Sequence, residues 1–172
     1  QAAMDMTMAV HRATGAMLHE GITASEVRAF IDKAHRKVGA SGSFFCIVLF
    51  GKGTSYPHGV NYEQRLEKDD WVLIDTGCKL HGYHSDITRT YARENGMFAD
   101  LIESMHQITK QCVDELKPGV PYLQIHSSAY RQIAALLNDV GIVNLTTDGV
   151  LESGIVNTFF PHGIGHFLGL QV

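Results

Sequence analysis

A short apolar run that ends directly in a carboxylate constrains the fold of this chain more than any other feature. Residues 71–75 read Trp-Val-Leu-Ile-Asp, and the turn-forming stretch Lys-Leu-His-Gly follows at 79–82. A short apolar run that is rich in β-branched and aromatic residues predicts a buried strand. The segment 83–91 is expected to return as a second strand, so the two segments predict an antiparallel hairpin.

The rest of the chain predicts mainly helices. Apolar residues recur at helical spacing in four segments, 4–19, 24–38, 97–116 and 122–140. Thr23 and Glu26 have the spacing of a capping box at the start of the second helix. Further strands are predicted at 44–50 and 157–160, and the polar segment 141–153 is expected to be a loop. Clustered helices and strands paired as hairpins predict the α+β class, with an antiparallel sheet and flanking helices.

Composition excludes several classes of protein. Apolar residues make up 45% and charged residues 19% of the 172 residues, a balance that fills a core and excludes a disordered chain. The net charge is −4, so we expect no binding to nucleic acid or to an anionic membrane surface. No apolar stretch approaches the roughly 20 residues that cross a bilayer.

The three cysteines indicate a reducing compartment. Cys46, Cys78 and Cys112 are an odd number, lie far apart in the sequence and form no Cys-x-x-Cys pair. Reduced, partly buried thiols are typical of cytosolic proteins. We therefore expect three free thiols and a cytoplasmic protein.

Two aspartates lie on opposite arms of the predicted hairpin. If the turn is centred on Leu80 and His81, Asp75 faces Asp86 with Cβ atoms about 5 Å apart. Two like charges at that distance destabilise a sheet, so either one carboxyl is protonated or a cation lies between them. Asp75 ends an apolar run, where an uncompensated charge is costly, and Asp86 falls inside a predicted strand, where Asp is disfavoured. The pattern predicts a metal ion bound by both carboxylates; the alternative is an exposed sheet face with incidental acids.

Polar residues extend this predicted site along the returning strand. Strand alternation places Asp86, Thr88 and Thr90 on one face. His84 shares that side by parity and is a weaker candidate for the same site.

Histidines in glycine-rich segments are the second signal of chemistry. Ten histidines is a high count for this length, and His58 lies between a proline and a glycine. His162 and His166 are four residues apart, separated by glycines that disfavour a helix. An extended strand places both imidazoles on one face. Beside a pair of acids, one imidazole is expected to bind the metal and the other to donate a hydrogen bond, although a lone histidine of this kind is more often structural.

Three separated segments resemble the metal-binding motifs of the pita-bread metallopeptidases, the fold family of creatinase and the aminopeptidases. They are Asp-Thr-Gly at 75–77, Tyr-His-Ser-Asp-Ile-Thr-Arg-Thr at 83–90, and Phe-Pro-His-Gly-Ile-Gly-His-Phe-Leu-Gly-Leu at 160–170. Within this family the chain is most similar to the Xaa-Pro peptidases, prolidase and aminopeptidase P, which Pro-His-Gly at 57–59 also resembles. The match extends over nearly the whole chain in family order and spacing.

The resemblance implies a role for each candidate residue. Asp75 would chelate one metal ion, Asp86 would bridge two, and His166 would be a ligand of one of them. His58 would bind substrate or handle protons, and His162 would line the substrate pocket, so both count as catalytic candidates.

The resemblance also implies the chemistry of the intact enzyme. Two divalent ions would supply a hydroxide that hydrolyses the X-Pro peptide bond of dipeptides or short peptides. Carboxylate-rich ligation favours Mn²⁺, with Co²⁺, Zn²⁺ or Fe²⁺ as alternatives. Thr88 would support the bridging carboxylate. The implied partner is a peptide with proline at P1′, and the implied oligomer is a homodimer.

Other parts of the family pattern lie outside this sequence. The family uses two further glutamate ligands on later strands, another histidine just beyond position 172, and a separate N-terminal domain. We therefore expect residues 1–172 to form a single, incomplete metallopeptidase catalytic domain, without the N-terminal domain and the last part of the catalytic domain, that does not turn over substrate alone.

Several alternatives remain open at this point. One is an aminopeptidase P-like exopeptidase rather than a dipeptidase. Another is a pita-bread domain that serves only as a binding module, although such relatives usually lose ligand residues. Creatinase-like cleavage of a C–N bond without metal, and a methionine aminopeptidase-type activity, are further alternatives.

Overall fold

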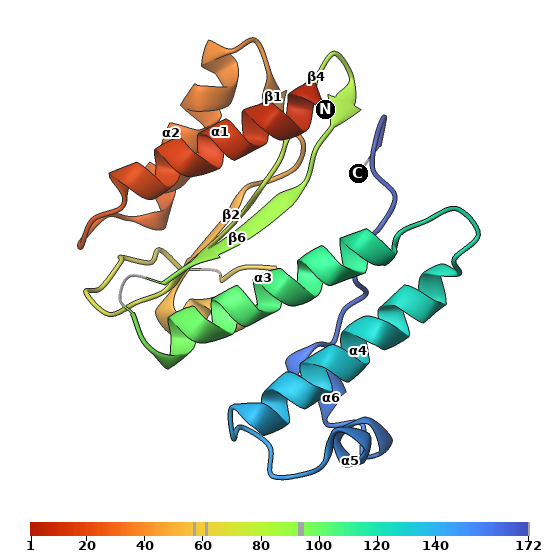
Figure 1. Cartoon of the computed structure of the whole chain (residues 1–172). Helices are drawn as coiled ribbons and strands as arrows, with labels where there is room; N and C mark the ends of the chain where they lie inside the picture. Colours follow the sequence, from red (N-terminus) through yellow and green to blue (C-terminus); the bar gives the residue numbers. More distant parts are fainter. Residues whose placement is uncertain (57, 61, 93–94, 172) are drawn as a thin grey trace. The chain divides into compact units, whose positions relative to one another are not determined.

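The structure is a computed structural model of the chain and describes residues 1–56, 58–60, 62–92 and 95–171. Two compact units make up the chain (Figure 1). Unit 1 comprises Gln1–Ala99 and Phe167–Val172, and unit 2 comprises Asp100–His166. The predicted α+β composition is confirmed by two helices with antiparallel sheets in unit 1 and by helices in unit 2.

Unit 1 combines two helices with short antiparallel strands. The helices are α1 (Ala2–Met17) and α2 (Ala24–Lys37). The remaining elements, in chain order, are β1 (Ser41–Gly42), β2 (Ile47–Phe50), the 3-10 helix η1 (Gly51–Ser55), β3 (Val72–Thr76), β4 (Cys78–Leu80), β5 (Tyr83–His84) and β6 (Ile87–Tyr91). The strands form two three-stranded sheets, with the orders β1–β4–β5 and β2–β3–β6.

Helices α1 and α2 lie side by side against one face of the β2–β3–β6 sheet (Figure 1). Residues of both helices and of this sheet face form one buried core, which includes Val10, Val27, Ile31, Val48, Phe50, Val72 and Ile74. Each apolar side chain of this size contributes about 1.5–3 kcal/mol when it is buried. In β3, Val72 and Ile74 are fully buried and Leu73 and Asp75 are half-buried. Because side chains alternate along a strand, Asp75 lies on the sheet face opposite the two helices.

The start of α2 follows the sequence prediction. The Thr23 side chain accepts a hydrogen bond from the Glu26 backbone amide at 3.2 Å. The Glu26 carboxylate accepts one from the Thr23 amide at 2.8 Å. This reciprocal pair satisfies two helix-end donors, so the predicted capping box is confirmed.

The hairpin forms, but its register differs from the prediction. Asp75 pairs with Thr88, not with Asp86. The turn is centred on His81 and Gly82, one residue later than expected, and this moves every pairing by two positions. Both turn residues have positive φ, 51° and 83°, as a two-residue type I′ turn requires. Glycine adopts that conformation without steric cost, so the turn forms where glycine occupies its second position.

The returning segment 83–91 is two strands rather than one. β5 ends at His84 and β6 begins at Ile87, so Ser85 and Asp86 lie between them. Gly77 interrupts the opposite arm, and a Cβ at that position would collide with the carbonyl oxygen of Ser85. The prediction that Asp86 sits within a strand is therefore wrong, because the two arms approach too closely here for a regular ladder.

Unit 2 is helical. It contains most of α3 (Met97–Glu115), followed by α4 (Tyr122–Asp139), α5 (Thr147–Glu152) and α6 (Val156–Phe159). The first two confirm the predicted helices. The predicted loop at 141–153 contains α5, and the predicted strand at 157–160 overlaps α6, so both predictions are wrong.

Packing against α4 explains these two short helices. Val150 of α5 and Val156 of α6 are buried in one cluster with residues of α4. The Thr146 side chain caps α5 by accepting a hydrogen bond from the Gly149 amide at 3.2 Å. Tertiary burial thus overrides a local sequence preference that is weak in such short segments.

The cysteine prediction is confirmed, since Cys46, Cys78 and Cys112 are all free and buried. Every helix in the described part of the chain is too short or too polar to span a bilayer.

Candidate metal centre

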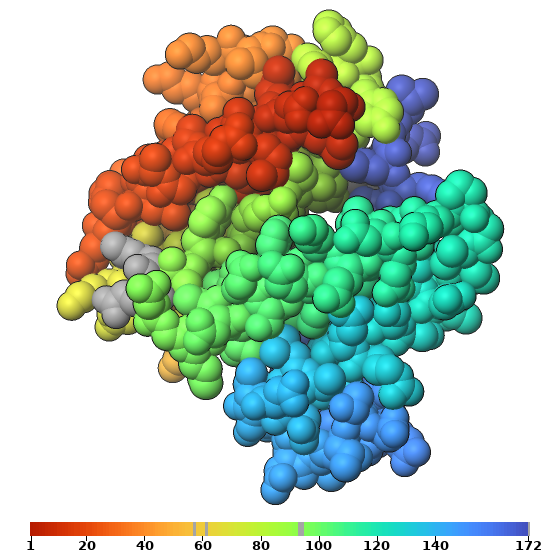
Figure 2. Space-filling view, viewed as in Figure 1, coloured from red at the N-terminus to blue at the C-terminus, as the bar shows by residue number. Residues whose placement is uncertain are grey.

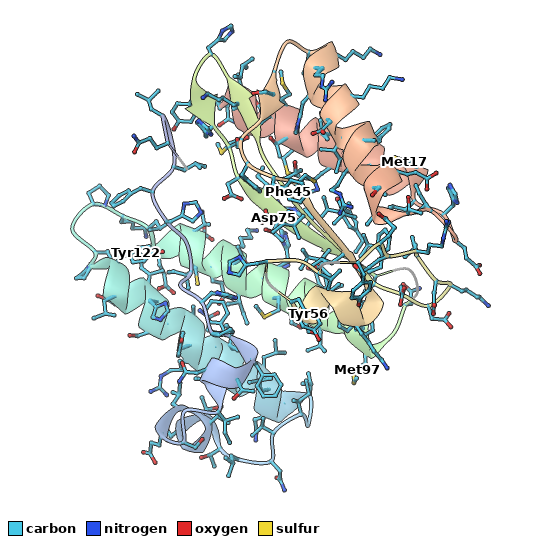
Figure 3. The ribbon with its side chains drawn as sticks, turned by 180° about the vertical axis from the view of Figure 1, so that it is seen from behind. Met17, Phe45, Tyr56, Asp75, Met97 and Tyr122 are labelled. Atoms are coloured by element: carbon cyan, nitrogen blue, oxygen red, sulfur yellow. The ribbon has the colours of Figure 1, made fainter. Side chains whose placement is uncertain are left out.

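Asp75 is held by strands on both sides. It pairs with Ile47 of β2 and Thr88 of β6, and its Oδ1 atom is buried. Figure 3 labels it in the middle of the β2–β3–β6 sheet. Burial raises the pKa of the neighbouring Cys46 thiol to about 11, and the charge of Asp75 adds to that rise. The half-buried Asp75 carboxylate thus has one oxygen removed from water.

Asp86 lies at the same end of the β3–β6 ladder. The last pair of the ladder joins Thr76 to Ile87, and each of the two acids immediately precedes one of these residues in the chain. Asp86 therefore follows the end of the ladder, diagonally across from Asp75. The predicted direct opposition of the two acids is therefore wrong, because Thr88 occupies the position opposite Asp75.

His84, the weaker candidate, is buried in β5. Its backbone amide donates to the carbonyl oxygen of Gly169 at 2.6 Å. Its Nδ1 atom is buried and accepts or donates no hydrogen bond among the described residues. Buried polar atoms are normally satisfied, so an imidazole nitrogen without a hydrogen-bond partner among the described residues keeps His84 as a candidate for a polar site.

His58 is exposed in a turn that follows η1. Pro57, the first residue of its motif, lies outside the described residues. Gly59 adopts φ 92° and its amide donates to the Tyr56 carbonyl at 3.0 Å, which closes the turn. The turn presents the imidazole to solvent and leaves it accessible to a substrate.

His162 and His166 lie in unit 2, and both are exposed. The predicted extended strand is absent: within the described residues, the 161–166 segment has no helix or strand. His166 borders a groove of about 290 Å³, lined largely by apolar side chains of α3 and α4. The Tyr122 hydroxyl donates to the Gly165 carbonyl at 2.9 Å and holds this segment against α4.

The predicted ligands are thus distributed over two units, with Asp75 and Asp86 in unit 1 and His166 in unit 2. In the part of the chain that the structure describes, no group of three or more His, Cys, Asp or Glu side chains could hold a metal ion. The metal-binding roles of these three residues, and the catalytic roles of His58 and His162, stay predictions.

Sequence reasoning missed a buried polar cluster next to Asp86. Thr7, His11 and Ser85 are between 0% and 2% exposed. The spacing of Thr7 and His11 could have indicated this cluster, because it places two polar side chains one turn apart on the apolar face of the first helix.

Comparison with known proteins identifies the family. The model of metallopeptidase family M24 matches residues 1–172. The chain belongs to metallopeptidase family M24. It is 57% identical over 104 residues to an Xaa-Pro dipeptidase of Pseudoalteromonas atlantica, which covers 58% of this chain and 24% of that protein.

Solved structures with the pita-bread fold agree with this assignment. A variant of Escherichia coli aminopeptidase P in complex with substrate matches with a TM-score of 0.94 and 25% identity, over 99% of this chain and 40% of that one. A zinc-substituted form of the same enzyme in complex with product matches equally well, with the same TM-score, identity and coverage. The predicted pita-bread fold is confirmed. The chain spans about a quarter of the length of the curated dipeptidases it matches.

The donors that the chain offers fit the metals of such a family. Carboxylates such as those of Asp75 and Asp86, at one end of the β3–β6 ladder, and an imidazole are typical ligands of divalent first-row metals.

Proposed function

We propose that this chain is part of the catalytic domain of a metal-dependent Xaa-Pro peptidase, and specifically of an Xaa-Pro dipeptidase. The placement of Asp75 and Asp86 next to the Thr76–Ile87 pair carries the proposal, because both acids fall at the same end of the β3–β6 ladder. The name of the 57% identical relative supports the dipeptidase. The residues 1–172 form a single partial domain in this proposal.

Each candidate residue has a defined task. Asp75, Asp86 and His166 hold two divalent ions, which when bound supply a hydroxide nucleophile and polarise the scissile carbonyl. His58 donates a hydrogen bond to the carbonyl oxygen as negative charge develops there. His162 lines the pocket and orients the substrate. Thr88, opposite Asp75 in the ladder, supports the orientation of the carboxylates.

The proposed substrate is a peptide with proline at P1′. Proline has no amide hydrogen, so recognition that depends on that donor fails at an X-Pro bond, while a metal-activated hydroxide needs no such donor. The second candidate is an aminopeptidase P-like exopeptidase, which the fold match to aminopeptidase P favours. Assays of the full-length enzyme with Ala-Pro and with Ala-Pro-Ala separate the two, since a dipeptidase cleaves only the first.

The metal, the cellular location and the oligomeric state are also part of the proposal. Mn²⁺ is the proposed metal because carboxylates dominate the ligand set, although the zinc-substituted neighbour indicates that the fold also admits Zn²⁺. Three free, buried thiols support a cytoplasmic location. A homodimer is proposed from the family resemblance.

The decisive experiment replaces the bridging acid. In the full-length enzyme, Asp86→Ala should abolish metal binding and lower kcat/KM for Ala-Pro by more than about 100-fold, because ligand loss exceeds the effect of losing an outer hydrogen bond. Mass spectrometry of bound metal and a proline-release assay measure the two effects. Asp114→Ala, which removes an exposed acid of α3, is the control and should change neither. Wild-type metal content and activity in Asp86→Ala would refute the proposed site.

A further inference from the structure

Helix α1 places two buried polar side chains against the segment that carries Asp86. Thr7 and His11 are 0% and 2% exposed, although they lie on a helix face that packs against the sheets. They are four residues apart and therefore project from the same side of the helix. In Figure 2, the N-terminal half of α1, in red, packs against the yellow-green β4–β5 hairpin.

Thr7 is bonded to the residue before Asp86. Its hydroxyl lies 2.8 Å from the Ser85 hydroxyl, and Ser85 is 0% exposed. The Ser85 hydroxyl in turn accepts a hydrogen bond from the Cys78 amide at 2.9 Å, and the Ser85 amide donates to the Cys78 carbonyl at 3.0 Å. The backbone at Ser85 is therefore fixed from both the helix and the opposite hairpin arm.

His11 is bonded to the residue after Asp86. Its Nε2 lies 2.8 Å from the Ile87 carbonyl oxygen, which can only accept, so Nε2 carries the proton. In the neutral imidazole Nδ1 is then an acceptor, and the Tyr91 hydroxyl donates to it at 3.0 Å. This chain of bonds fixes the tautomer and ties the beginning and the end of β6 to α1.

We propose that Thr7 and His11 are positioning residues that fix the backbone on both sides of Asp86 and so orient its carboxylate toward the metal ions. The proposal rests on the proposed function, because it takes Asp86 as a metal ligand. Asp86 lies outside both β5 and β6, so the strand ladder alone does not set its direction. The helix supplies that constraint through a side-chain bond before the acid and a backbone bond after it.

Helix α1 also provides a matched control. Thr14 is 0% exposed like Thr7 and lies seven residues further along the same helix face. Its hydroxyl donates to the Val10 carbonyl at 2.8 Å and, among the described residues, makes no bond to the 85–87 segment. Thr14→Val therefore removes a hydroxyl that is as buried as that of Thr7 but leaves the hydrogen bonds on either side of Asp86 intact.

The test measures Mn²⁺ binding to the full-length enzyme by calorimetry, together with deuterium uptake of the 84–88 segment in the metal-free enzyme. Thr7→Val should weaken Mn²⁺ binding by about 10-fold or more, as loss of a hydrogen bond that orients a ligand does, and should raise deuterium uptake at 84–88. Thr14→Val should leave both within about twofold of wild type, and Thr7→Ser, which keeps the hydroxyl, should restore binding relative to Thr7→Val. His11→Gln retains a donor for the Ile87 carbonyl, so it should bind Mn²⁺ more tightly than His11→Leu.

The outcomes separate this inference from the proposed function. If Asp86→Ala abolishes Mn²⁺ binding while Thr7→Val and His11→Leu bind as wild type does, the positioning role is refuted and the metal site stands. If Thr14→Val weakens binding as much as Thr7→Val, general loosening of the helix accounts for the effect and the positioning role is also refuted. If Asp86→Ala binds Mn²⁺ like wild type, the metal site itself is refuted and this inference fails with it.

Discussion

The two regions that carry the candidate residues are built in different ways. Asp75 and Asp86 lie in a hairpin that is constrained by two sheets, by a type I′ turn and by buried hydrogen bonds from α1. His162 and His166 lie in an exposed, glycine-rich segment without regular secondary structure, attached to α4 by the bond from Tyr122. The segment that carries the carboxylates is therefore fixed by strands and helix bonds of unit 1, whereas the segment that carries the imidazoles has no strand or helix of its own.

The largest effect is expected from adding one carbon atom to the hairpin. Gly77→Ala places a Cβ against the Ser85 carbonyl oxygen, and a backbone atom cannot move aside, so we expect a loss of roughly 3 kcal/mol, as in overpacked cores. Gly163→Ala is the matched substitution in unit 2, where the nearest atom, the Gly165 carbonyl oxygen, lies at an ordinary 3.8 Å. Urea unfolding of both variants measures the difference. Equal destabilisation would show that the two regions do not differ in rigidity.

Acid should weaken unit 1 through two buried histidines. Burial lowers the pKa of His11, with smaller contributions from Arg89 and His35, and burial also lowers the pKa of His35. In the unfolded chain both side chains have the ordinary pKa of 6.5. Below that pH the unfolded state therefore binds more protons than the folded state. The contribution of these two histidines to the free energy of unfolding is therefore fully present above pH 6.5. It is lost as the pH falls from 6.5 through the lower pKa values that the two side chains have in the folded protein.

Thermal unfolding between pH 7.5 and 5, with EDTA present to remove any contribution from metal release, measures this dependence. His35 is the more informative position to change, since neither of its ring nitrogens has a hydrogen-bond partner among the described residues. His35→Leu should flatten the pH dependence of the unfolding midpoint. An unchanged slope would contradict the assignment to this side chain.

The smallest effect is expected in the histidine segment. Tyr122→Phe removes the hydrogen bond to the Gly165 carbonyl, which is worth about 1 kcal/mol. Because the segment is exposed, we expect faster deuterium uptake at 162–166 with little change in the unfolding midpoint. Ser127→Ala, which removes an exposed hydroxyl bonded to the Leu123 carbonyl within α4, is the control and should leave uptake at 162–166 unchanged. A lowered midpoint without a local change in uptake would contradict the view that this bond acts only on the segment.

Much of the fold could be predicted because its signals are local. The start of α2 follows from the Thr23–Glu26 capping box, and the long helices follow from apolar spacing. The predicted register was wrong although a local signal was present: a type I′ turn favours glycine at its second position, which centres the turn on His81 and Gly82 rather than on Leu80 and His81. The helix α6 could not be predicted, since Val156 gains its burial from α4, which is distant in sequence.

The sequence by itself determined the helices, the hairpin and the residue types of the candidate site, because periodicity, capping and motif order are properties of neighbouring residues. Tertiary structure alone decided that Asp86 lies between two strands and that α1 bonds to the residues on either side of it. The bonds from α1 join residues nearly 80 positions apart, and their geometry is set only when the helix packs against the sheet.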